Sequence, residues 1–338
     1  LIMMESMSAE FMKHFGQSET LTPFLDSLYT RSISFRNFYS AGIHTNHGLY
    51  ATLYSFPAMM KRNLMKGSVI PRYSGLPTVL KENGYYNLFF MTHEGQYDNM
   101  NAFFRTNGYD EVFSQEDYPA DKVVNSFGVQ DDFLYDYAIP VLNQRAATGQ
   151  PFFATLLSIS NHPPYVIPPF FHPKTSEPET QIVEYADWAL RQFFEEARKQ
   201  PWFDNTIFVL EGDHGKLVGD AECELPESYN HIPLMIYSSR IQPEEKTTFG
   251  GQVDIQPTIL GLLNIDYLQN NFGVDLLKEE RPCMFYTADN MVVGRNDTLL
   301  YLYNYETQQE LTYDIGNGKL NAVPMDDSFL PLKEYSFS

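Results

Sequence analysis

Residues 206–215 read Thr-Ile-Phe-Val-Leu-Glu-Gly-Asp-His-Gly. The apolar, β-branched run at 206–210 predicts a buried strand, and the glycines after it predict a turn. Asp213 and His214 stand directly beyond this strand, between two glycines. In open α/β sheets, ligands bind beyond the carboxyl ends of the strands. The stretch therefore predicts a strand of an α/β sheet that ends in a catalytic or metal-binding pair.

Other apolar runs along the chain have the same form, at 1–4, 87–91 and 151–159, and a further buried strand is predicted at 232–237. Helical patterns separate these runs, at 9–15, 23–32, 49–60, 76–83, 130–144, 180–200 and 254–263. Strands that alternate with helices favour a mostly parallel sheet covered on both faces. The fold class is therefore α/β, a three-layer α/β/α sandwich.

The pattern changes after about residue 270. Short strands are predicted at 284–286, 291–293, 298–303 and 310–313, with turn residues between them. Closely spaced short strands are typical of an antiparallel sheet. We expect a catalytic domain over residues 1–270 and a small antiparallel β subdomain over residues 271–338.

Composition excludes several classes of function. The 338 residues include 23 Lys and Arg against 43 Asp and Glu, a net charge of −20. Such a chain lacks the basic footprint that nucleic acids or an anionic membrane surface require. Cys223 and Cys283 exclude a disulfide framework and a four-thiolate zinc site, and whether they pair stays open. The chain starts at Leu1, inside a predicted strand, so we expect a fragment whose upstream part was removed.

Polar residues that follow the apolar runs make up the first set of candidate site residues. They are Glu5, His93, His162, Asp213 and His214. Each has an ordinary structural reading, such as a first-turn acid or a solvated turn histidine, but all are predicted at one edge of the sheet. Carboxylates with imidazole suit a divalent cation such as Mn²⁺, Mg²⁺ or Zn²⁺.

Thr45 is the candidate nucleophile. It lies in Ser-Ala-Gly-Ile-His-Thr-Asn-His-Gly, residues 40–48, just before the helix predicted at 49–60. A threonine there makes a good N-cap, which is the structural reading. The same position offers free N–H groups and partial positive charge to an anion. A hydroxyl that also touches a metal loses its proton more easily and can attack phosphorus or sulfur.

Several motifs in order carry a family resemblance. Met-Glu-Ser is followed by Leu-Thr-Pro-Phe-Leu-Asp-Ser-Leu, Phe-Arg-Asn-Phe-Tyr-Ser-Ala-Gly, Thr45 and Gly-Asp-His-Gly. Further motifs lie at 107–110, 160–165, 231–234 and 253–260. Over about residues 1–280 the chain resembles the alkaline phosphatase superfamily, and within it the lipoteichoic acid synthase-like, sulfatase-related phosphoglycerol transferases.

The resemblance implies a fold and a set of site residues. It implies an alkaline phosphatase-like fold with one divalent metal, Mn²⁺ first with Mg²⁺ or Zn²⁺ as alternatives. The implied ligands are Glu5, Thr45, Asp213 and His214. His162 would give a proton to the leaving group and His93 would hold the substrate phosphate. The further substrate-binding candidates are Asn46, Asp98 and Asn99.

The resemblance also implies an activity and a place. Members are anchored by N-terminal transmembrane helices, with the catalytic domain outside the bacterial cytoplasmic membrane, periplasmic or extracellular. The implied reaction moves a phosphoglycerol- or phosphoethanolamine-type group from a phospholipid to a glycan, lipid or water acceptor, through a covalent threonine ester.

Two departures from the family pattern bear on the substrate. Lipoteichoic acid synthases carry Trp-Asn-Arg where this chain has Asp98-Asn99-Met100, so the phosphate-binding Arg is absent and Arg105 is the candidate substitute. Asp98 favours a zwitterionic headgroup or a glycan acceptor over a growing polyanion. The chain also lacks the Cys-x-Pro-x-Arg or Ser-x-Pro-x-Arg signature of true sulfatases.

Two rival functions stay open at this stage. One is a phosphodiesterase, phosphonate-type or sulfuric ester hydrolase that uses the same site with water as acceptor, and a two-metal version would call on His231. The other is a non-catalytic binding domain, against which the joint presence of Glu5, Thr45, Asp213 and His214 argues. Bound metal and turnover of a generic phosphodiester would separate these readings. The sequence leaves headgroup, acceptor and oligomeric state open.

Overall fold

A mixed eight-stranded sheet forms the centre of the protein, in a computed structural model that describes residues 1–67, 69–316 and 318–337. The strand order is β10-β2-β9-β8-β1-β7-β3-β4. The strands are β1 (Ile2–Met4), β2 (Ile33–Tyr39), β3 (Tyr86–Phe90), β4 (Glu111–Phe113), β7 (Phe152–Leu157), β8 (Phe208–Gly212), β9 (Leu234–Tyr237) and β10 (Glu244–Gly251). All neighbours are parallel except that β9 runs antiparallel to β2 and β8. The predicted mostly parallel sheet is confirmed.

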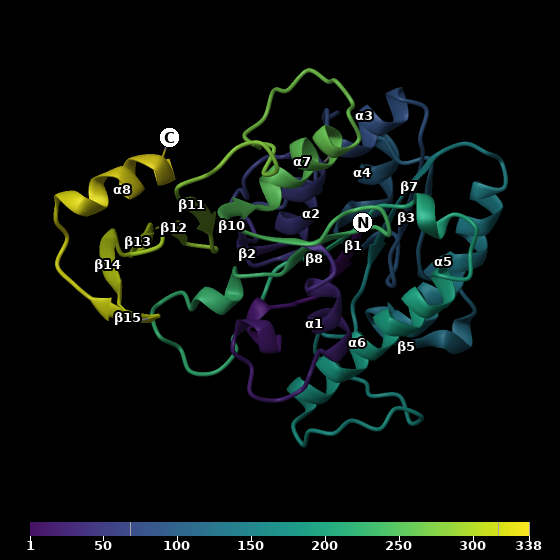
Figure 1. Ribbon diagram of the computed structural model, residues 1–338, viewed down its shortest axis with the longest axis horizontal. Helices are drawn as coiled ribbons and strands as arrows, with labels where there is room; N and C mark the ends of the chain where they lie inside the picture. Colours follow the sequence, from purple (N-terminus) through teal and green to yellow (C-terminus); the bar gives the residue numbers. More distant parts are fainter. Residues whose placement is uncertain (68, 317, 338) are drawn as a thin grey trace.

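Helices cover both faces of this sheet (Figure 1). On one side lie α1 (Pro23–Tyr29), α5 (Asp131–Ala146) and α6 (Pro178–Ala197); on the other lie α2 (Thr45–Tyr54), α3 (Leu76–Glu82), α4 (Met100–Thr106) and α7 (Ile255–Leu262). Alternate residues of β1 point into the two cores on either side of the sheet. Ile2 and Met4 pack in the core under α1, α5 and α6, and Met3 packs in the core on the side of α2 and α4. A strand buried on both faces is apolar at every position, which is why the sequence shows continuous apolar runs.

A second, five-stranded antiparallel sheet lies at the end of the chain, beside the main body (Figure 1, left). Its strands are β11 (Met284–Thr287), β12 (Met291–Arg295), β13 (Leu299–Asn304), β14 (Gln309–Gly316) and β15 (Lys319–Ala322), and α8 (Leu330–Phe337) packs on β12. The rings of Tyr286 and Tyr39 stack with centroids 5.1 Å apart across the junction. The small antiparallel sheet is confirmed, while the boundary at residue 270 stays a prediction.

Two predicted helices differ from the structure. The helix predicted at 49–60 begins earlier, at Thr45, and ends at Tyr54 because Ser55 is left-handed (φ 57°) and Phe56 precedes Pro57. The helix predicted at 9–15 is two 3₁₀ turns, η1 (Ala9–Phe11) and η2 (Lys13–Phe15), because Met12 between them is extended.

Some elements were not predicted from sequence. They are β2, β4, β10, β15, α4, α8 and the hairpin of β5 (Val123–Asn125) with β6 (Gly128–Val129). The strand β10 is the clearest case, because it lies at the sheet edge and begins with exposed charged residues that show no apolar run.

The structure adds two facts about the chain as a whole. Cys223 and Cys283 are both free thiols. No helix in the described part of the chain has both the length and the hydropathy that are needed to span a bilayer.

Candidate active site

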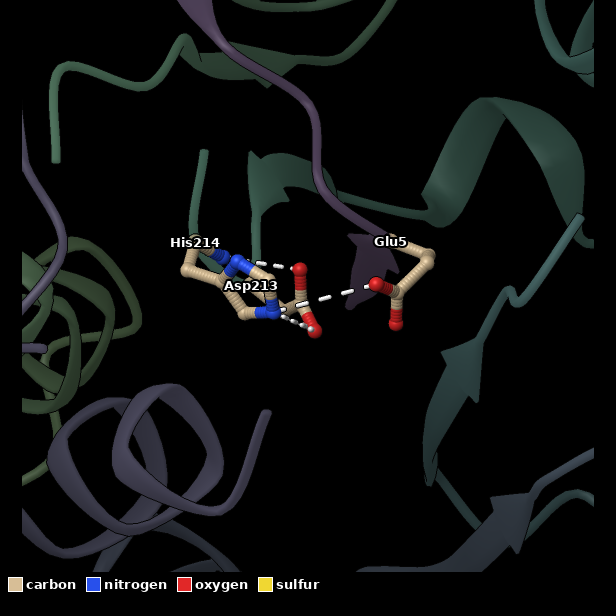
Figure 2. A group of neighbouring side chains, drawn as sticks. All are labelled: Glu5, Asp213 and His214. Atoms are coloured by element: carbon tan, nitrogen blue, oxygen red, sulfur yellow. Dashed lines mark hydrogen bonds and ion pairs between the residues drawn. The ribbon is translucent and has the colours of Figure 1, made fainter. Parts of the chain in front are cut away.

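Glu5, Asp213 and His214 converge at the carboxyl edge of the main sheet (Figure 2). Glu5 follows β1, and Asp213 and His214 follow β8, its neighbour in the sheet. His214 Nε2 lies 3.7 Å from Glu5 Oε1 and 3.7 Å from Asp213 Oδ2. A cation bound at about 2.1 Å from its ligands keeps ligand atoms about 3–4 Å apart. The spacing therefore suits three ligands of one ion.

Hydrogen bonds hold the two carboxylates in place. Asp213 Oδ1 accepts the backbone N–H groups of Ser6 (2.8 Å) and His214 (2.7 Å). The Ser6 hydroxyl donates to Glu5 Oε1 at 2.6 Å. Asp213 Oδ2 is buried and has no hydrogen-bond partner among the described residues. Since a buried carboxylate oxygen without a donor is costly, this atom indicates a missing positive partner.

The electrostatics of the cluster point the same way. Burial, followed by the nearby Asp213 charge, raises the pKa of Glu5 to about 8. Burial acts to lower the pKa of His214, but the Asp213 and Glu5 carboxylates raise it on balance. Two buried acids that face one another favour binding of a divalent cation. The donor set and its unpartnered oxygen therefore fit a metal ion, and its identity is not fixed by them.

Thr45 lies at this cluster, with its hydroxyl 3.4 Å from Glu5 Oε2. It is the first residue of α2, and the extended His44 takes the N-cap position that the sequence reading gave to Thr45. Thr45 therefore lies on the first turn of the helix and is not its N-cap. Gly48 allows α2 to pack closely against the turn after β8, because a Cβ at this position would lie 2.2 Å from the Asp213 carbonyl oxygen.

Gln252 braces the site and was missed from sequence. Its amide donates to the carbonyls of Gly212 (3.1 Å) and Asp213 (2.8 Å), and its oxygen accepts the Ala41 N–H at 2.9 Å. One buried side chain thus ties the turn after β8 to the loop that leads into Thr45. A lone glutamine inside a helical pattern carries no sequence signal for such a role.

A cavity of about 950 Å³ opens over these residues. Thr45, Asn46, His162 and His214 line it, together with Asp98. Five of the predicted site residues therefore share one hollow beside the metal-binding cluster.

The two predicted substrate histidines differ in position. His162 lines the cavity, with Nδ1 2.6 Å from the Pro163 carbonyl and its ring 4.1 Å from Phe127. His93 lies behind the wall, 2% exposed, with its ring 4.6 Å from that of Tyr97. Burial lowers the pKa of His93, which keeps its ring neutral.

The stretch aligned with Trp-Asn-Arg is already engaged with its neighbours. Asp98 forms an ion pair with Lys66 at 2.7 Å. The Asn99 amide donates to the Met65 carbonyl at 2.9 Å, and Asn99 is not among the described residues that line the cavity. Lys66 therefore offsets part of the Asp98 charge beside the cavity, and the preference for a zwitterionic headgroup or a glycan acceptor stays a prediction.

The two remaining candidates are also held elsewhere. Arg105 donates to Asn101 Oδ1 at 2.8 Å and does not appear in the described cavity wall. His231 bonds Glu10 (2.7 Å) and the Arg36 carbonyl (2.9 Å), so both ring nitrogens are occupied. Neither residue joins the described cluster that could bind metal.

Lys216 is a cavity residue that sequence reasoning missed. Its Nζ donates to Asn161 Oδ1 (2.6 Å) and the Tyr165 hydroxyl (3.1 Å). Burial lowers the pKa of Lys216 to about 8. A lysine two residues after a candidate ligand resembles any surface lysine, so only the packing reveals its position.

The fold is shared with solved proteins of known class. A protein of the alkaline phosphatase superfamily from Vibrio parahaemolyticus superposes with a TM-score of 0.89 at 28% identity, over 99% of this chain and 84% of that one. A lipoteichoic acid synthase from Listeria monocytogenes gives a TM-score of 0.84 at 20% identity, over 99% of this chain and 88% of that one. The fold is thus the alkaline phosphatase-like sandwich that the resemblance implied.

Sequence comparisons give the family. The sulfatase family model matches residues 1–265. Lipoteichoic acid synthase 1 of Bacillus subtilis is 27% identical, over 74% of this chain and 41% of its own length. Phosphoglycerol transferase I of Xanthomonas campestris is 25% identical, over 82% of this chain and 42% of its own length. The chain belongs to the sulfatase family of enzymes, and it spans less than half the length of these two relatives.

Proposed function

We propose that this protein is a metal-dependent phosphotransferase. It moves a phosphoglycerol- or phosphoethanolamine-type group from a phospholipid to an envelope acceptor, through a covalent ester on Thr45. The observation that carries the proposal is the Thr45 hydroxyl, which lies at the start of α2 and 3.4 Å from a carboxylate of the candidate metal cluster. The names of the relatives support the reaction type.

Thr45 attacks the phosphorus of the donor diester. Its hydroxyl proton passes to solvent, its oxygen forms the new P–O bond, and the lipid alkoxide leaves with the electrons of the old one. A divalent cation held by Glu5, Asp213 and His214, with Mn²⁺ favoured over Mg²⁺ and Zn²⁺, would lower the pKa of the hydroxyl and offset charge on the phosphoryl oxygens. The backbone N–H groups of Thr45 and Asn46, the first two residues of α2, have no acceptor within the helix and can stabilise negative charge.

His162 handles the proton in this scheme. The bond between Nδ1–H and the Pro163 carbonyl leaves Nε2 as the nitrogen that exchanges a proton. The imidazolium protonates the leaving alcohol, and the neutral ring then accepts the proton of the acceptor hydroxyl that attacks the ester. We assign substrate contacts to Asn46 and Asp98 in the cavity wall. His93 and Asn99 support that wall from behind.

The proposed partners set the place of the reaction. The donor is a phospholipid headgroup and the acceptor is a glycan, a lipid or water. We place the site on the extracytoplasmic face of the bacterial cytoplasmic membrane, where such headgroups and envelope acceptors meet.

Thr45→Ala and Thr45→Ser test the proposal together. With Mn²⁺ and vesicles containing phosphatidylglycerol or phosphatidylethanolamine, Thr45→Ala should lose about 1,000-fold or more in transfer, because the nucleophile is gone. Thr45→Ser keeps a hydroxyl and should keep measurable transfer. Mass spectrometry of the wild type should find the headgroup phosphate on the peptide that carries Thr45. Substantial transfer by Thr45→Ala would exclude the covalent route.

Hydrolysis is the second candidate function. A phosphonate monoester hydrolase from Silicibacter pomeroyi shares the fold, with a TM-score of 0.73 at 17% identity. Water would then resolve the Thr45 ester in place of an acceptor hydroxyl. The ratio of free headgroup phosphate to transferred product, measured with glycerol or a glycan present, separates the two: a hydrolase releases free product whatever acceptor is added.

A further inference from the structure

The wall of the active-site cavity carries little positive charge for an enzyme that takes a phosphate ester. Among the described residues that line it, Lys216 is the sole Lys or Arg, whereas Glu10, Asp98 and Glu179 are acidic. Of these acids, Asp98 is paired with Lys66 and Glu10 with His231. The whole chain has a net charge of −20. An anion that enters this cavity therefore depends on local positive charge.

The backbone of Lys216 is clamped to the turn after β1. Its N–H donates to the Ser8 hydroxyl at 2.9 Å, and the same hydroxyl donates to the Lys216 carbonyl at 2.9 Å. The preceding Gly215 donates to the Tyr229 carbonyl at 2.9 Å. A Cβ on Gly215 would lie 2.0 Å from the Ser228 carbonyl oxygen, so this close approach requires glycine. These contacts hold the backbone of Lys216 in one position.

The buried side chain of Asn161 sets the direction of the Lys216 side chain. Asn161 is 3% exposed, and its amide nitrogen donates to the carbonyls of Glu5 (3.1 Å) and Ser6 (3.0 Å). These two bonds turn Asn161 Oδ1 toward the lysine, which it meets at 2.6 Å. The backbone that carries the metal-cluster residue Glu5 therefore positions the ammonium group through one side chain.

The partners of the ammonium group are neutral. Nζ bonds Asn161 and the Tyr165 hydroxyl, and it lies 4.7 Å from the centroid of the Tyr165 ring and 5.3 Å from that of Phe11. No carboxylate of the described chain lies within ion-pair distance of Nζ, unlike Asp98 beside Lys66, and the charges of Glu5 and Glu179 act on Lys216 from further away. An ammonium has three donors, so one remains after these two bonds. A largely buried cation without a counter-ion is matched when a ligand brings the negative charge.

We propose that Lys216 binds anionic phosphoryl oxygens of the substrate in this cavity. The inference rests on the proposed function, and it names the residue that recognises the phosphate ester. Lys216 acts as a point charge with one free donor, beside an aromatic face that shields it from water. The shared chemistry is the phosphate group, whether it belongs to a lipid diester or to free phosphate.

The experiment compares Lys216→Met and Lys216→Arg with the matched control Lys199→Gln, which removes an exposed lysine at the end of α6. Calorimetry measures binding of inorganic phosphate to the Mn²⁺-loaded protein. Lys216→Met should weaken that binding about tenfold or more, because a charge-assisted bond is lost. Lys199→Gln should stay within about twofold and Lys216→Arg within about fivefold of the wild type.

A second arm uses vesicles of phosphatidylglycerol, with bis(4-nitrophenyl) phosphate as a soluble diester. Lys216→Met should raise the KM for these diesters about tenfold, with affinity for Mn²⁺ within about twofold of the wild type. An effect confined to inorganic phosphate identifies the subsite with free phosphate, whereas an effect on vesicles identifies it with the lipid.

Stability provides the structural readout. Because Lys216 has no counter-ion, Lys216→Met should melt no lower than the wild type without ligand. A lower melting temperature with phosphate affinity and KM unchanged would overturn the inference and make Lys216 a structural residue. If the wild type turns over no phosphodiester while Lys216→Met still loses phosphate, the proposed function fails and the anion subsite stands. If Lys216→Met turns over the diester normally with an unchanged KM, the inference about Lys216 is wrong and the proposed function stands.

Discussion

Two aspartates, Asp213 and Asp254, are equally buried and have opposite surroundings. Both are 0% exposed. Asp254 precedes α7 and receives Arg281 through several bonds, the shortest 2.7 Å, together with the N–H groups of Gly251 and Val274. Asp213 receives two N–H groups on one oxygen and none of the described donors on the other.

The difference separates an acid whose charge is matched inside the protein from one with an unpartnered oxygen, which we propose binds the metal. The charge of Asp254 is matched inside the protein by a guanidinium group, so the pair needs nothing from outside. The charge of Asp213 faces Glu5, a second buried carboxylate, and is matched when a cation binds. Burial alone is thus the same in both places, and the donors around each oxygen distinguish them.

Asp213→Asn tests the functional side of the comparison and should have the largest effect. Transfer should fall about 1,000-fold or more, and affinity for Mn²⁺ at least about 100-fold, because a charged ligand is lost. The amide oxygen can still accept the two N–H bonds, so the metal-free protein should melt no lower than the wild type. Retained Mn²⁺ affinity would refute the cluster as a metal site.

Asp254→Asn tests the structural side. It should reduce the free energy of unfolding by about 3–5 kcal/mol, because Arg281 is left buried without its counter-ion. Affinity for Mn²⁺, measured on the folded fraction, should stay near the wild-type value. Adding Arg281→Gln should recover part of the loss, and strict additivity in a double-mutant cycle would contradict the pairing.

Removing the metal should make stability depend on pH. The folded pKa of Glu5, about 8, lies above its ordinary value of 4.5. The proton-bound folded state is therefore fully favoured below about pH 4.5, and that contribution is lost as pH rises toward 8. In chelator, chemical denaturation should show a loss on the order of a few kcal/mol between about pH 5 and 8. Mn²⁺, or Glu5→Gln, should reduce this loss, while a residual slope remains because burial also raises the pKa of Glu211 to about 8 and that of Asp187 to about 7. A loss of the same size in Glu5→Gln would contradict the assignment to Glu5.

Asp98→Asn is the mildest change. Its partner Lys66 is 62% exposed, so the loss in unfolding free energy should be below about 0.5 kcal/mol. The ratio of transfer rates from phosphatidylglycerol and phosphatidylethanolamine should change less than about threefold, since Lys66 already offsets the charge. A reversal of donor preference would show that Asp98 selects the headgroup.

Much of the site could be predicted because its residues follow strands. Glu5, Asp213 and His214 each end an apolar run, and parallel strands bring such ends together. The sheet itself was readable for the same reason, since strands buried on both faces are apolar throughout. The edge strand β10 was not predicted, because its exposed positions are polar and show no apolar run.

What sequence reasoning missed depends on contacts between distant segments. Lys216 is defined by Asn161 and Tyr165, more than fifty positions away along the chain. Lys66 changes the meaning of Asp98 through an ion pair that no local pattern announces. Thr45 was found as a residue near a helix start, but its place on the first turn depended on the extended backbone of His44.

The loop before Thr45 lies at the junction between the two sheets and is held by residues of both. Thr287 of β11 gives its N–H and its hydroxyl to the Ala41 carbonyl, each at 3.0 Å, and His44 bonds Asp289 at 2.8 Å. Recombination between relatives that crossed between these segments would separate the loop before Thr45 from the strand that holds it. The two stretches are therefore expected to be inherited, and to be exchanged by an engineer, as one unit.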